Sequence, residues 1–266
     1  MKNDTIVLIP HYNNPEGLAR SLASIDPEEQ LDVLIVDDGS IHKPNESRLN
    51  SCFKANGTVY YIYLESNKGI EHALNTGLEY IVFKKVYTFI ARLDCGDYCV
   101  GKRFAIQQQF FKNNPQVKLV GSNVMAIDLD GAFLYNIIVP SKGNDITHKM
   151  YLNCMFIHPT VMFKTEVLAV TGYYPLHYKS AEDYAFFFKI VKNFETANIN
   201  EFLVKIEINP AGISITRRKQ QVSSRIKVIK DNFYFGFYPV YGLVRSIILY
   251  YIPNSLIKYV KTKLVK

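Results

Sequence analysis

Short apolar runs alternate with helix-like stretches along the first part of the chain. Four runs have the length and composition of buried parallel-sheet strands, at residues 5–10, 31–36, 59–64 and 86–91. Apolar residues recur at helical spacing in stretches between and after these runs, at residues 15–25, 70–80 and 101–113. This alternation predicts right-handed βαβ units and a parallel, doubly wound sheet with helices on its faces.

The remainder of the chain has a less regular pattern. It predicts strands at 117–120, 124–127, 156–163 and 201–208, and a helix at 181–191. No internal repeat and no low-complexity linker precedes residue 216. We therefore expect one α/β domain over residues 1–216 and a helical tail over residues 217–266.

A polar cluster follows each of the first four predicted strands. The clusters are Tyr12-Asn13, Asp37-Asp38-Gly39-Ser40, Asn67-Lys68-Gly69 and Asp94-Cys95-Gly96-Asp97. In open α/β sheets, ligands bind beyond the carboxyl ends of the strands. The sequence therefore predicts one binding site where these four loops meet.

The composition indicates a folded protein with a substantial core. Of the 266 residues, 48% are hydrophobic and 21% are charged, which argues against a disordered chain. There is no run of 18 apolar residues of the kind that spans a membrane, and the first residues lack a signal-peptide pattern. The four cysteines have no zinc-like spacing, and we expect reduced thiols in a cytoplasmic protein.

Positive charge is concentrated in the predicted tail. Residues 217–266 contain eleven Lys and Arg but one acid, Asp231, together with nine Phe and Tyr. Basic, aromatic and aliphatic residues in one segment favour a membrane surface with acidic lipids. One alternative is a helical pair packed on the body with a solvated basic face. Another is nucleic-acid binding, for which no motif is found, and we expect no nucleic-acid partner.

Two acidic pairs follow predicted strands. Asp94 and Asp97 can hold Mg²⁺ or Mn²⁺ together with phosphate oxygens, or they can form a turn that caps a helix. Asp37 and Asp38 can accept hydrogen bonds from a ribose or a base, or they can belong to a capped turn. The glycine-rich dinucleotide motif and the P-loop are both absent from the sequence, which disfavours those two kinds of nucleotide site.

A third acidic pair, Glu182-Asp183, begins a strongly apolar predicted helix. Acids in a first turn favour the helix dipole, and a carboxylate at the rim of a pocket can also act as a general base. His158 lies beside Pro159, and a single histidine in that context is more often structural than functional.

Seven short motifs follow one another over residues 6–190, about 70% of the chain. They are Ile9–Asn13, Val36–Ser40, Asn67–Gly69 with Ala73–Gly77, Ala91–Asp97, His158–Met162, Gly172-Tyr173 and Ala181–Tyr184. In this order they resemble the inverting family 2 glycosyltransferases, which have the GT-A fold. The resemblance implies a Rossmann-like, mostly parallel central sheet flanked by helices.

The resemblance also implies a role for several motifs. A nucleoside-diphosphate-sugar, expected to be a UDP-sugar, lies across the N-terminal half, and the diphosphate is held near Asp94 through Mg²⁺ or Mn²⁺. Asp183, with Glu182 beside it, takes the proton from an acceptor hydroxyl that attacks the anomeric carbon in line. Asp37 and Asp38 are expected to contact uracil and ribose. The full set of expected donor-binding residues is Pro10, Tyr12, Asn13, Asp37, Asp38, Asn67, Lys68, Arg92 and Asp94.

The chain departs from the family pattern at two positions. The family usually has Asp-x-Asp-Asp where this chain has Asp94-Cys95-Gly96-Asp97, so Gly96 replaces the common direct metal ligand. A histidine that many members carry in a late loop corresponds to Asn209 here. The expected metal ligands are therefore Asp94, Asp97 and Asn209, and an inactive, degenerate member is an alternative.

Together these observations predict a cytoplasmic glycosyltransferase at the inner face of the cytoplasmic membrane. The expected acceptor is lipid-linked or a surface glycan, in lipopolysaccharide, O-antigen or capsule assembly. One alternative is a non-catalytic sugar-nucleotide-binding or scaffold protein. A second is a nucleotidyltransferase, but such enzymes usually have a Gly-rich loop with a basic residue where this chain has Pro10-His11-Tyr12-Asn13.

Overall fold

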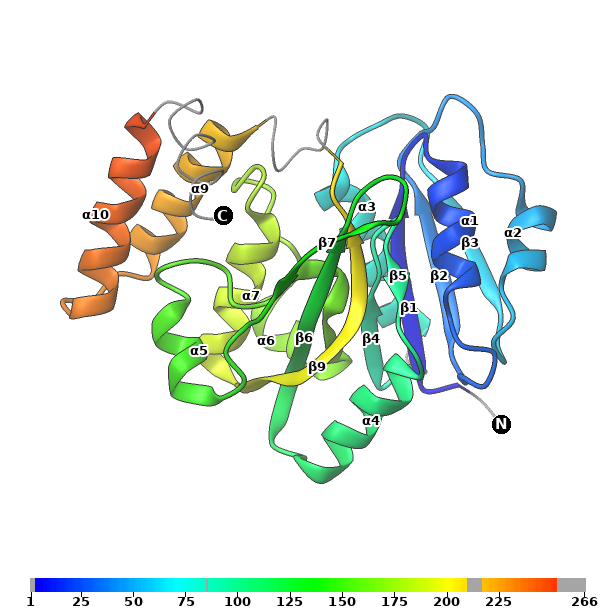
Figure 1. Ribbon diagram of the computed structural model, residues 1–266, viewed down its shortest axis with the longest axis horizontal. Coiled ribbons are helices and arrows are strands. Elements are labelled where there is room, and N and C mark those ends of the chain that lie inside the picture. Colours follow the sequence, from blue (N-terminus) through cyan, green and yellow to red (C-terminus); the bar gives the residue numbers. More distant parts are fainter. Residues whose placement is uncertain (1–2, 85, 210–216, 253–266) are drawn as a thin grey trace.

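The strands of the described residues form one mixed sheet with helices on both of its faces (Figure 1). The computed structural model describes residues 3–84, 86–209 and 217–252. The strands are β1 (Thr5–His11), β2 (Asp32–Asp37), β3 (Val59–Tyr63), β4 (Phe89–Arg92), β5 (Tyr98–Cys99), β6 (Val117–Ile127), β7 (Phe133–Ile137), β8 (Met162–Lys164) and β9 (Glu195–Glu207). Along the sheet their order is β3-β2-β1-β4-β8-β6-β9-β5, and β7 also pairs with β6.

Helices cover the sheet and extend beyond it. They are α1 (Pro15–Ala23), α2 (Glu46–Cys52), α3 (Ile70–Lys84), α4 (Arg103–Asn113), α5 (Gly143–Lys149), α6 (Leu168–Thr171), α7 (Glu182–Asn193), α9 (Arg218–Asp231) and α10 (Phe237–Tyr251). Two short 3₁₀ turns, η1 (His158–Thr160) and η2 (Thr165–Val167), flank β8.

The parallel half of the sheet is as the sequence predicts. Strands β1 to β4 pair in parallel, and the chain moves outward from β1 to β3 before it returns to the other side of β1. The reversal creates a switch point between β1 and β4, which is where open α/β sheets bind ligands. The carboxyl end of β4 is therefore expected to border the site.

Alternate residues of β1 face two separate cores. Ile6 and Leu8 pack with residues of α3 and α7, whereas Val7 and Ile9 pack with residues of α1 and α4. All four side chains are fully buried, as expected for a central strand covered on both faces. A side chain at Gly77 of α3 would lie 2.3 Å from Cδ1 of Leu8, so the glycine permits the close packing of this helix on the sheet.

The second half differs from the prediction in its strands. The two strands predicted at 117–120 and 124–127 are one strand, β6, which pairs in parallel with β9 along its length. The strand predicted at 156–163 is wrong over most of its length, because His158–Thr160 form η1 and only Met162–Lys164 pair as β8. Pro159 has no N–H to donate to a ladder. Since β8 runs antiparallel to β4 and β6, the sheet is mixed beyond β4.

Helices α9 and α10 form a hairpin that packs on the body. Val228 and Ile229 of α9 belong to the same core as α3 and α7. The guanidinium of Arg218, at the start of α9, donates to the carbonyl oxygens of Leu249 and Ile252 at the end of α10. The part of the predicted tail at 253–266 lies outside the described residues. Within the described ranges, no helix has both the length and the apolar character needed to cross a bilayer.

Candidate active site

Asp37 at the end of β2 is held by side chains from two neighbouring segments. His11 Nδ1 lies 2.7 Å from Asp37 Oδ1, and the hydroxyl and N–H of Ser40 donate to the two carboxylate oxygens at 2.6 and 2.9 Å. The N–H of Asn14 donates to His11 Nε2 at 3.1 Å, so the imidazole proton is on Nδ1 and is donated to Asp37. This network fixes the ends of β1 and β2 relative to each other.

Asp38 holds the loop before α3. Its two oxygens accept hydrogen bonds from the N–H groups of Lys68 and Gly69, at 2.8 and 2.9 Å. Gly69 has a φ of +101°, in the region that favours glycine, which lets the two N–H groups point at one carboxylate. Burial raises the pKa of Asp38 above its ordinary value.

The remaining donor-side residues lie around these two carboxylates. Tyr12, Asn13, Asn67 and Lys68 are exposed at the loops, whereas Pro10 is buried within β1. The N–H of Asn13 donates to the Ser40 hydroxyl at 2.8 Å, which ties the loop after β1 to the loop after β2. The structure therefore brings together the three loops that follow β1, β2 and β3.

Arg92 lies at the end of β4 with its guanidinium fully buried. The guanidinium donates to the carbonyl oxygen of Leu8 in β1, to Asp94 and to His158. From behind, Arg103 of α4 donates to the carbonyl oxygen of Arg92 at 2.7 Å. The side chain of Asp94 is 30% exposed, so this carboxylate is both anchored by Arg92 and accessible from the rim.

His158 accepts a hydrogen bond at the centre of the site. Nε2 of its ring lies 3.3 Å from Arg92 Nε, which donates to it, and 3.0 Å from the hydroxyl of Tyr174. Burial, followed by the charge of Arg92, lowers the pKa of His158 despite the opposing charges of Asp94 and Asp183. The histidine is therefore a neutral acceptor, although the sequence favoured only a structural interpretation.

Glu182 and Asp183 form the first turn of α7 and differ in environment. Asp183 is partly exposed, and one of its oxygens accepts a hydrogen bond from the N–H of Tyr184 at 2.7 Å. Glu182 is 8% exposed, and its Oε2 has no hydrogen-bond partner in the described part of the chain. Burial and the charge of Asp183 raise the pKa of Glu182 to about 8. Glu182 therefore keeps its proton at neutral pH while its neighbour is the candidate base.

Tyr174 is influenced electrostatically by acids from separate segments. Burial raises the pKa of Tyr174, and the charges of Asp183, Asp94 and Glu182 raise it further against the opposing effect of Arg92. Asp38 is connected to this group through Glu71 in the first turn of α3. After burial, the charge of Glu71 contributes to the raised pKa of both Asp38 and Glu182.

The residues expected to bind metal have unequal access to the site. Asp97 is 8% exposed, and its Oδ1 accepts a hydrogen bond from the N–H of Glu207 at 2.9 Å. Burial, followed by the charge of Asp94, raises the pKa of Asp97 well above its ordinary value. Asn209 is exposed just beyond the end of β9. Gly96 has a φ of +105°, and a side chain there would begin 3.5 Å from Oε1 of Glu207.

This donor set fits a cation that phosphate oxygens help to hold. No group of three or more His, Cys, Asp or Glu in the described ranges could hold a metal ion by itself. Mg²⁺, however, is commonly bound by one or two carboxylates with substrate phosphates and water completing the shell. Asp94 and Asp97 meet that minimum. Burial is the main cause of the raised pKa of Asp97, and a cation would offset the charge of Asp94, which is the second cause.

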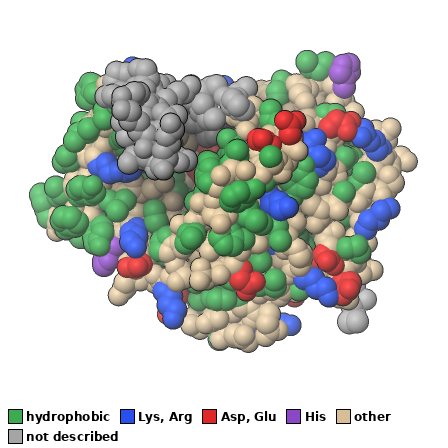
Figure 2. Space-filling model, viewed as in Figure 1, with side chains coloured by type: hydrophobic (Ala, Val, Ile, Leu, Met, Phe, Trp, Pro, Cys, Tyr) green, Lys and Arg blue, Asp and Glu red, His purple; other side chains and the backbone are tan. Residues whose placement is uncertain are grey.

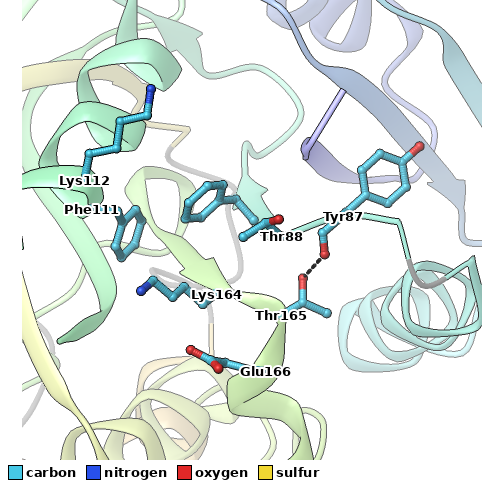
Figure 3. A pocket seen from close by; sticks show the side chains of 8 residues that line it. Tyr87, Thr88, Phe111, Lys112, Lys164, Thr165 and Glu166 are labelled. Carbon is cyan, nitrogen blue, oxygen red and sulfur yellow. Dashed lines mark hydrogen bonds between the residues drawn. The ribbon is translucent and has the colours of Figure 1, made fainter. Parts of the chain in front are cut away.

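Two cavities lie at the amino ends of β4, β6 and β9, at the opposite end of the sheet from these carboxylates. One, of about 460 Å³, lies between the start of β4 and the end of β8, where the Thr165 hydroxyl donates to the Tyr87 carbonyl at 2.8 Å (Figure 3). The other, of about 900 Å³, is lined by the first residues of β6 and β9 together with α5 and the end of α7. Both are therefore separate from the site bordered by Asp94 and Asp183.

Several residues of this site were not assigned a role by the sequence. His11 and Ser40 lie inside two of the motifs, but the motifs do not show that both side chains contact Asp37. Along the chain, Asp37 is 26 residues from His11 and 3 residues from Ser40. Tyr174 and Glu71 lie beside motifs and carry no signal of their own. The proximity of Tyr174 to the buried ring of His158 becomes visible only in the fold.

Sequence comparisons identify the family. The model described as Glycosyl transferase family 2 matches residues 6–169, more than half of the chain. The amylovoran biosynthesis glycosyltransferase AmsE of Erwinia amylovora is 26% identical over 229 residues, covering 84% of each chain. The O-antigen biosynthesis glycosyltransferase WbnJ of Escherichia coli is 30% identical over 139 residues, covering 51% of this chain and 54% of its own.

Solved structures confirm the fold. S. aureus TarS 1–349 in complex with UDP-GlcNAc matches with a TM-score of 0.67 at 17% identity, covering 93% of this chain and 72% of that one. A longer TarS structure is covered over 41% of its length. The mannosyltransferase PcManGT from Pyrobaculum calidifontis, in complex with GDP-Man and Mn²⁺, matches with a TM-score of 0.62 at 15% identity. The match covers 92% of this chain and 69% of that one. The chain thus belongs to glycosyl transferase family 2, as a glycosyltransferase with the GT-A fold.

Proposed function

We propose that this glycosyltransferase moves a sugar from a nucleoside-diphosphate-sugar to an acceptor hydroxyl with inversion at the anomeric carbon. The observation that carries the proposal is the arrangement at the end of β4: Arg92 pairs with Asp94 and donates to His158, whose ring lies 3.0 Å from the hydroxyl of Tyr174. The charge of Asp183, at the start of α7, is among those that raise the pKa of this tyrosine. A base beside the phosphate-binding end of a sheet is what an in-line displacement needs. UDP is the proposed nucleotide, supported by the UDP-GlcNAc in the TarS complex.

Asp183 is the proposed general base. Its carboxylate is partly exposed, and the N–H of Tyr184 orients one oxygen. The acceptor hydroxyl gives its proton to Asp183 while its oxygen bonds to the anomeric carbon, and the bond to the diphosphate breaks on the opposite face. No covalent enzyme intermediate forms. A positioned base of this kind contributes about 10²–10⁴-fold to the rate.

Glu182 has a different proposed role in the pair. With a pKa of about 8 it is protonated at neutral pH, so the pair carries one negative charge and not two. A second charge beside Asp183 would also repel the approaching diphosphate. Glu182 thus acts as a positioning residue that leaves the negative charge on Asp183.

The proposed donor site lies at the ends of β1, β2, β3 and β4. Tyr12, Asn13 and Asn67 offer exposed polar groups there, and Lys68 offers a positive charge. The contacts of Asp37 and Asp38 with uracil and ribose remain part of the proposal, although both carboxylates also hold the surrounding loops. Arg92 supports the diphosphate end through its ion pair with Asp94.

A divalent cation, Mg²⁺ or Mn²⁺, is the proposed cofactor. When bound, it supplies neutralisation of the negative charge that develops on the leaving diphosphate. The residues that would hold it are Asp94, Asp97 and Asn209, with diphosphate oxygens completing the ligand set. The Mn²⁺ in the PcManGT complex supports this assignment.

The proposed acceptor is lipid-linked or a surface glycan, at the inner face of the cytoplasmic membrane. The support is the naming of AmsE and WbnJ for amylovoran and O-antigen biosynthesis, together with the basic, aromatic character of residues 217–266. The enzyme would be a peripheral protein there, since the acceptor's lipid lies at the bilayer surface.

A donor screen tests the reaction class. The full chain, with Mg²⁺ or Mn²⁺, is incubated with UDP-, GDP- and CMP-sugars and simple glycoside acceptors, and the released nucleotide is measured. Release of UDP from one UDP-sugar, with an inverted anomeric product by NMR, is the expected result. Binding of UDP without turnover would indicate a non-catalytic binding protein. Pyrophosphate release from a nucleoside triphosphate and a sugar phosphate would indicate a nucleotidyltransferase.

A further inference from the structure

Helix α10 leaves several large apolar side chains exposed. They are Phe237, Tyr241, Val244, Ile247, Ile248 and Tyr251, each between 40% and 77% exposed. Their spacing of three, four or seven residues places them on one face of the helix. Figure 2 shows the resulting hydrophobic surface at the left end of the molecule.

The opposite face of α10 is docked on the body, where Tyr238 and Leu243 pack against the core. Pro239, Gly242 and Ser246 are buried. A side chain at Gly242 would lie 2.1 Å from the carbonyl oxygen of Tyr151, so no larger residue fits at this contact. A surface helix normally buries its apolar stripe and exposes its polar one. In α10 an apolar stripe stays exposed although the helix is docked by its other face.

The docked orientation of α10 is held by polar contacts. Arg245, the charged residue of the helix, points inward and donates to the carbonyl oxygen of Leu152 at 2.8 Å. The ring of Tyr238 stacks on His148 of α5 with centroids 4.9 Å apart. With Arg218 bound to the last carbonyls of the helix, rotation of the apolar stripe toward the body would break all of these contacts.

We propose that the apolar stripe of α10 inserts into the interface of an anionic lipid bilayer, with the helix axis parallel to the membrane plane. This inference rests on the membrane location proposed above and names the surface responsible. An apolar stripe with aromatic residues toward both ends is typical of interfacial helices. Its length is also right for lying on a membrane and too short for crossing one.

Charge around the stripe selects a bilayer over a protein partner. Arg217, Lys219, Lys227 and Lys230 are exposed on the adjoining α9, and Asp231, the acid of this hairpin, is engaged by the hydroxyl of Tyr178. The sequence that follows the hairpin, 253–266, has four lysines and no acid. Basic groups beside an exposed apolar stripe match acidic headgroups above acyl chains.

The hairpin also contacts the segment that leads to the proposed base. The hydroxyl of Ser224 in α9 donates to the carbonyl oxygen of Lys179 at 2.8 Å, and the Ser180 hydroxyl donates to Gln220 at 3.3 Å. Residues 179–181 run directly into Glu182-Asp183. A bilayer held at α10 would therefore lie beside the acceptor end of the site, as a lipid-linked acceptor requires.

The test is sedimentation of the full chain with vesicles, without any sugar donor. The double variant Val244→Asp, Ile248→Asp places two charges in the stripe, and Val170→Asp, at a 60% exposed valine of α6, is the matched control. Wild type and control should sediment with phosphatidylcholine–phosphatidylglycerol vesicles, also at high salt, whereas the double variant should bind about tenfold or more weakly. Thermal melting of each variant checks that the fold is intact.

Three results would overturn the inference. The double variant could bind vesicles like wild type, which would leave the membrane location to another surface. Wild type could fail to sediment with vesicles at all. Wild type could be a dimer that the double variant converts to a monomer with unchanged vesicle binding, which would make the stripe a contact between copies. Nucleotide release from a water-soluble acceptor assay reports on the proposed reaction independently of each result.

Discussion

Arg92 and His158 meet through a hydrogen bond in which the buried guanidinium is the donor. Nε of Arg92 lies 3.3 Å from Nε2 of His158, so the imidazole carries its proton on Nδ1, which lies 3.9 Å from Asp94 Oδ2. A protonated His158 would lose this acceptor and would place a second positive charge beside Arg92. The contact therefore depends on a neutral histidine.

The stability of the protein should decrease when His158 is forced to titrate. Its folded pKa is lowered below the ordinary value of 6.5, so the unfolded chain binds a proton that the folded chain does not. Stability should therefore fall as the pH drops below about 6.5. His158→Gln keeps an acceptor without a titrating ring and should flatten this fall, measured as melting temperature between about pH 5 and pH 7. His42→Gln, at an exposed histidine, should leave the profile unchanged, and identical profiles for both variants would contradict the assignment.

Asp183→Asn should remove the base and leave the donor site intact. Turnover should fall by about 10²–10⁴-fold, because the acceptor hydroxyl loses its proton acceptor, while the Kd for UDP measured by calorimetry stays within about twofold of wild type. Asp130→Asn, at an exposed aspartate of the turn before β7, is the matched control. Wild-type turnover in Asp183→Asn would exclude Asp183 as the base.

Glu182→Gln should stabilise the protein at neutral and mildly alkaline pH. In the unfolded chain the Glu182 carboxyl ionises near its ordinary pKa of 4.5, whereas in the folded protein its pKa is about 8. The free energy of unfolding therefore decreases as the pH rises through that interval. Glutamine imitates the neutral carboxyl and does not titrate, which should raise the free energy of unfolding by on the order of 1–3 kcal/mol at neutral pH. Urea titrations at several pH values measure this change. Glu201→Gln, on the exposed side of β9, should have the wild-type slope.

Gly96→Asp restores the family's acid but should destabilise this chain. The left-handed φ of +105° strains any side chain at position 96, and the Cβ of the new aspartate would lie 3.5 Å from Oε1 of Glu207. Gly131→Asp is the control, since its φ is +84° and no atom lies within 4 Å of the added carbon. Backbone strain should lower the free energy of unfolding of both variants by about 1–3 kcal/mol. Repulsion between the new carboxylate and Glu207 should lower it further in Gly96→Asp.

Manganese provides a second measurement on the same pair of glycine variants. If Asp94 and Asp97 hold a cation, Mn²⁺ with UDP should narrow the difference in melting temperature between Gly96→Asp and Gly131→Asp, because the cation neutralises the crowded carboxylates. An unchanged difference would argue against a cation at this position.

The parallel half of the fold could be predicted because its signals are local. Each strand from 5–10 to 86–91 is an apolar run that ends in polar residues, and the helices at 15–25 and 70–80 show a helical period. The short helix α2 between β2 and β3 was not predicted. The second half depends on pairing between distant segments. Strand β7 is short and exposed, and β6 continues through a stretch that looked like two strands because β9 pairs along all of it.

The carboxylates of the site could be predicted, but their partners could not. Asp94 and Asp183 follow a strand and open a helix, and such positions are visible in one sequence. The neutral state of His158 depends on Arg92, 66 residues away, and on the burial that the fold provides. The exposed apolar stripe of α10 was also missed, since composition reports which residues the tail contains and not which of them face outward.

The hydrogen bonds of Asp37 and Asp38 to the surrounding loops affect how the protein could discriminate between donors. Their hydrogen bonds run to groups of the chain itself, so the end of the site that is proposed to bind the nucleotide is ordered before any ligand arrives, and the entropy of ordering it is lost during folding. A preorganised nucleotide site of this kind can bind many nucleotide-sugars that share one nucleotide. The residues near Tyr174 and Asp183 would then determine which of those sugars is transferred. Related proteins could evolve specificity for a new sugar there and keep the nucleotide-binding residues unchanged.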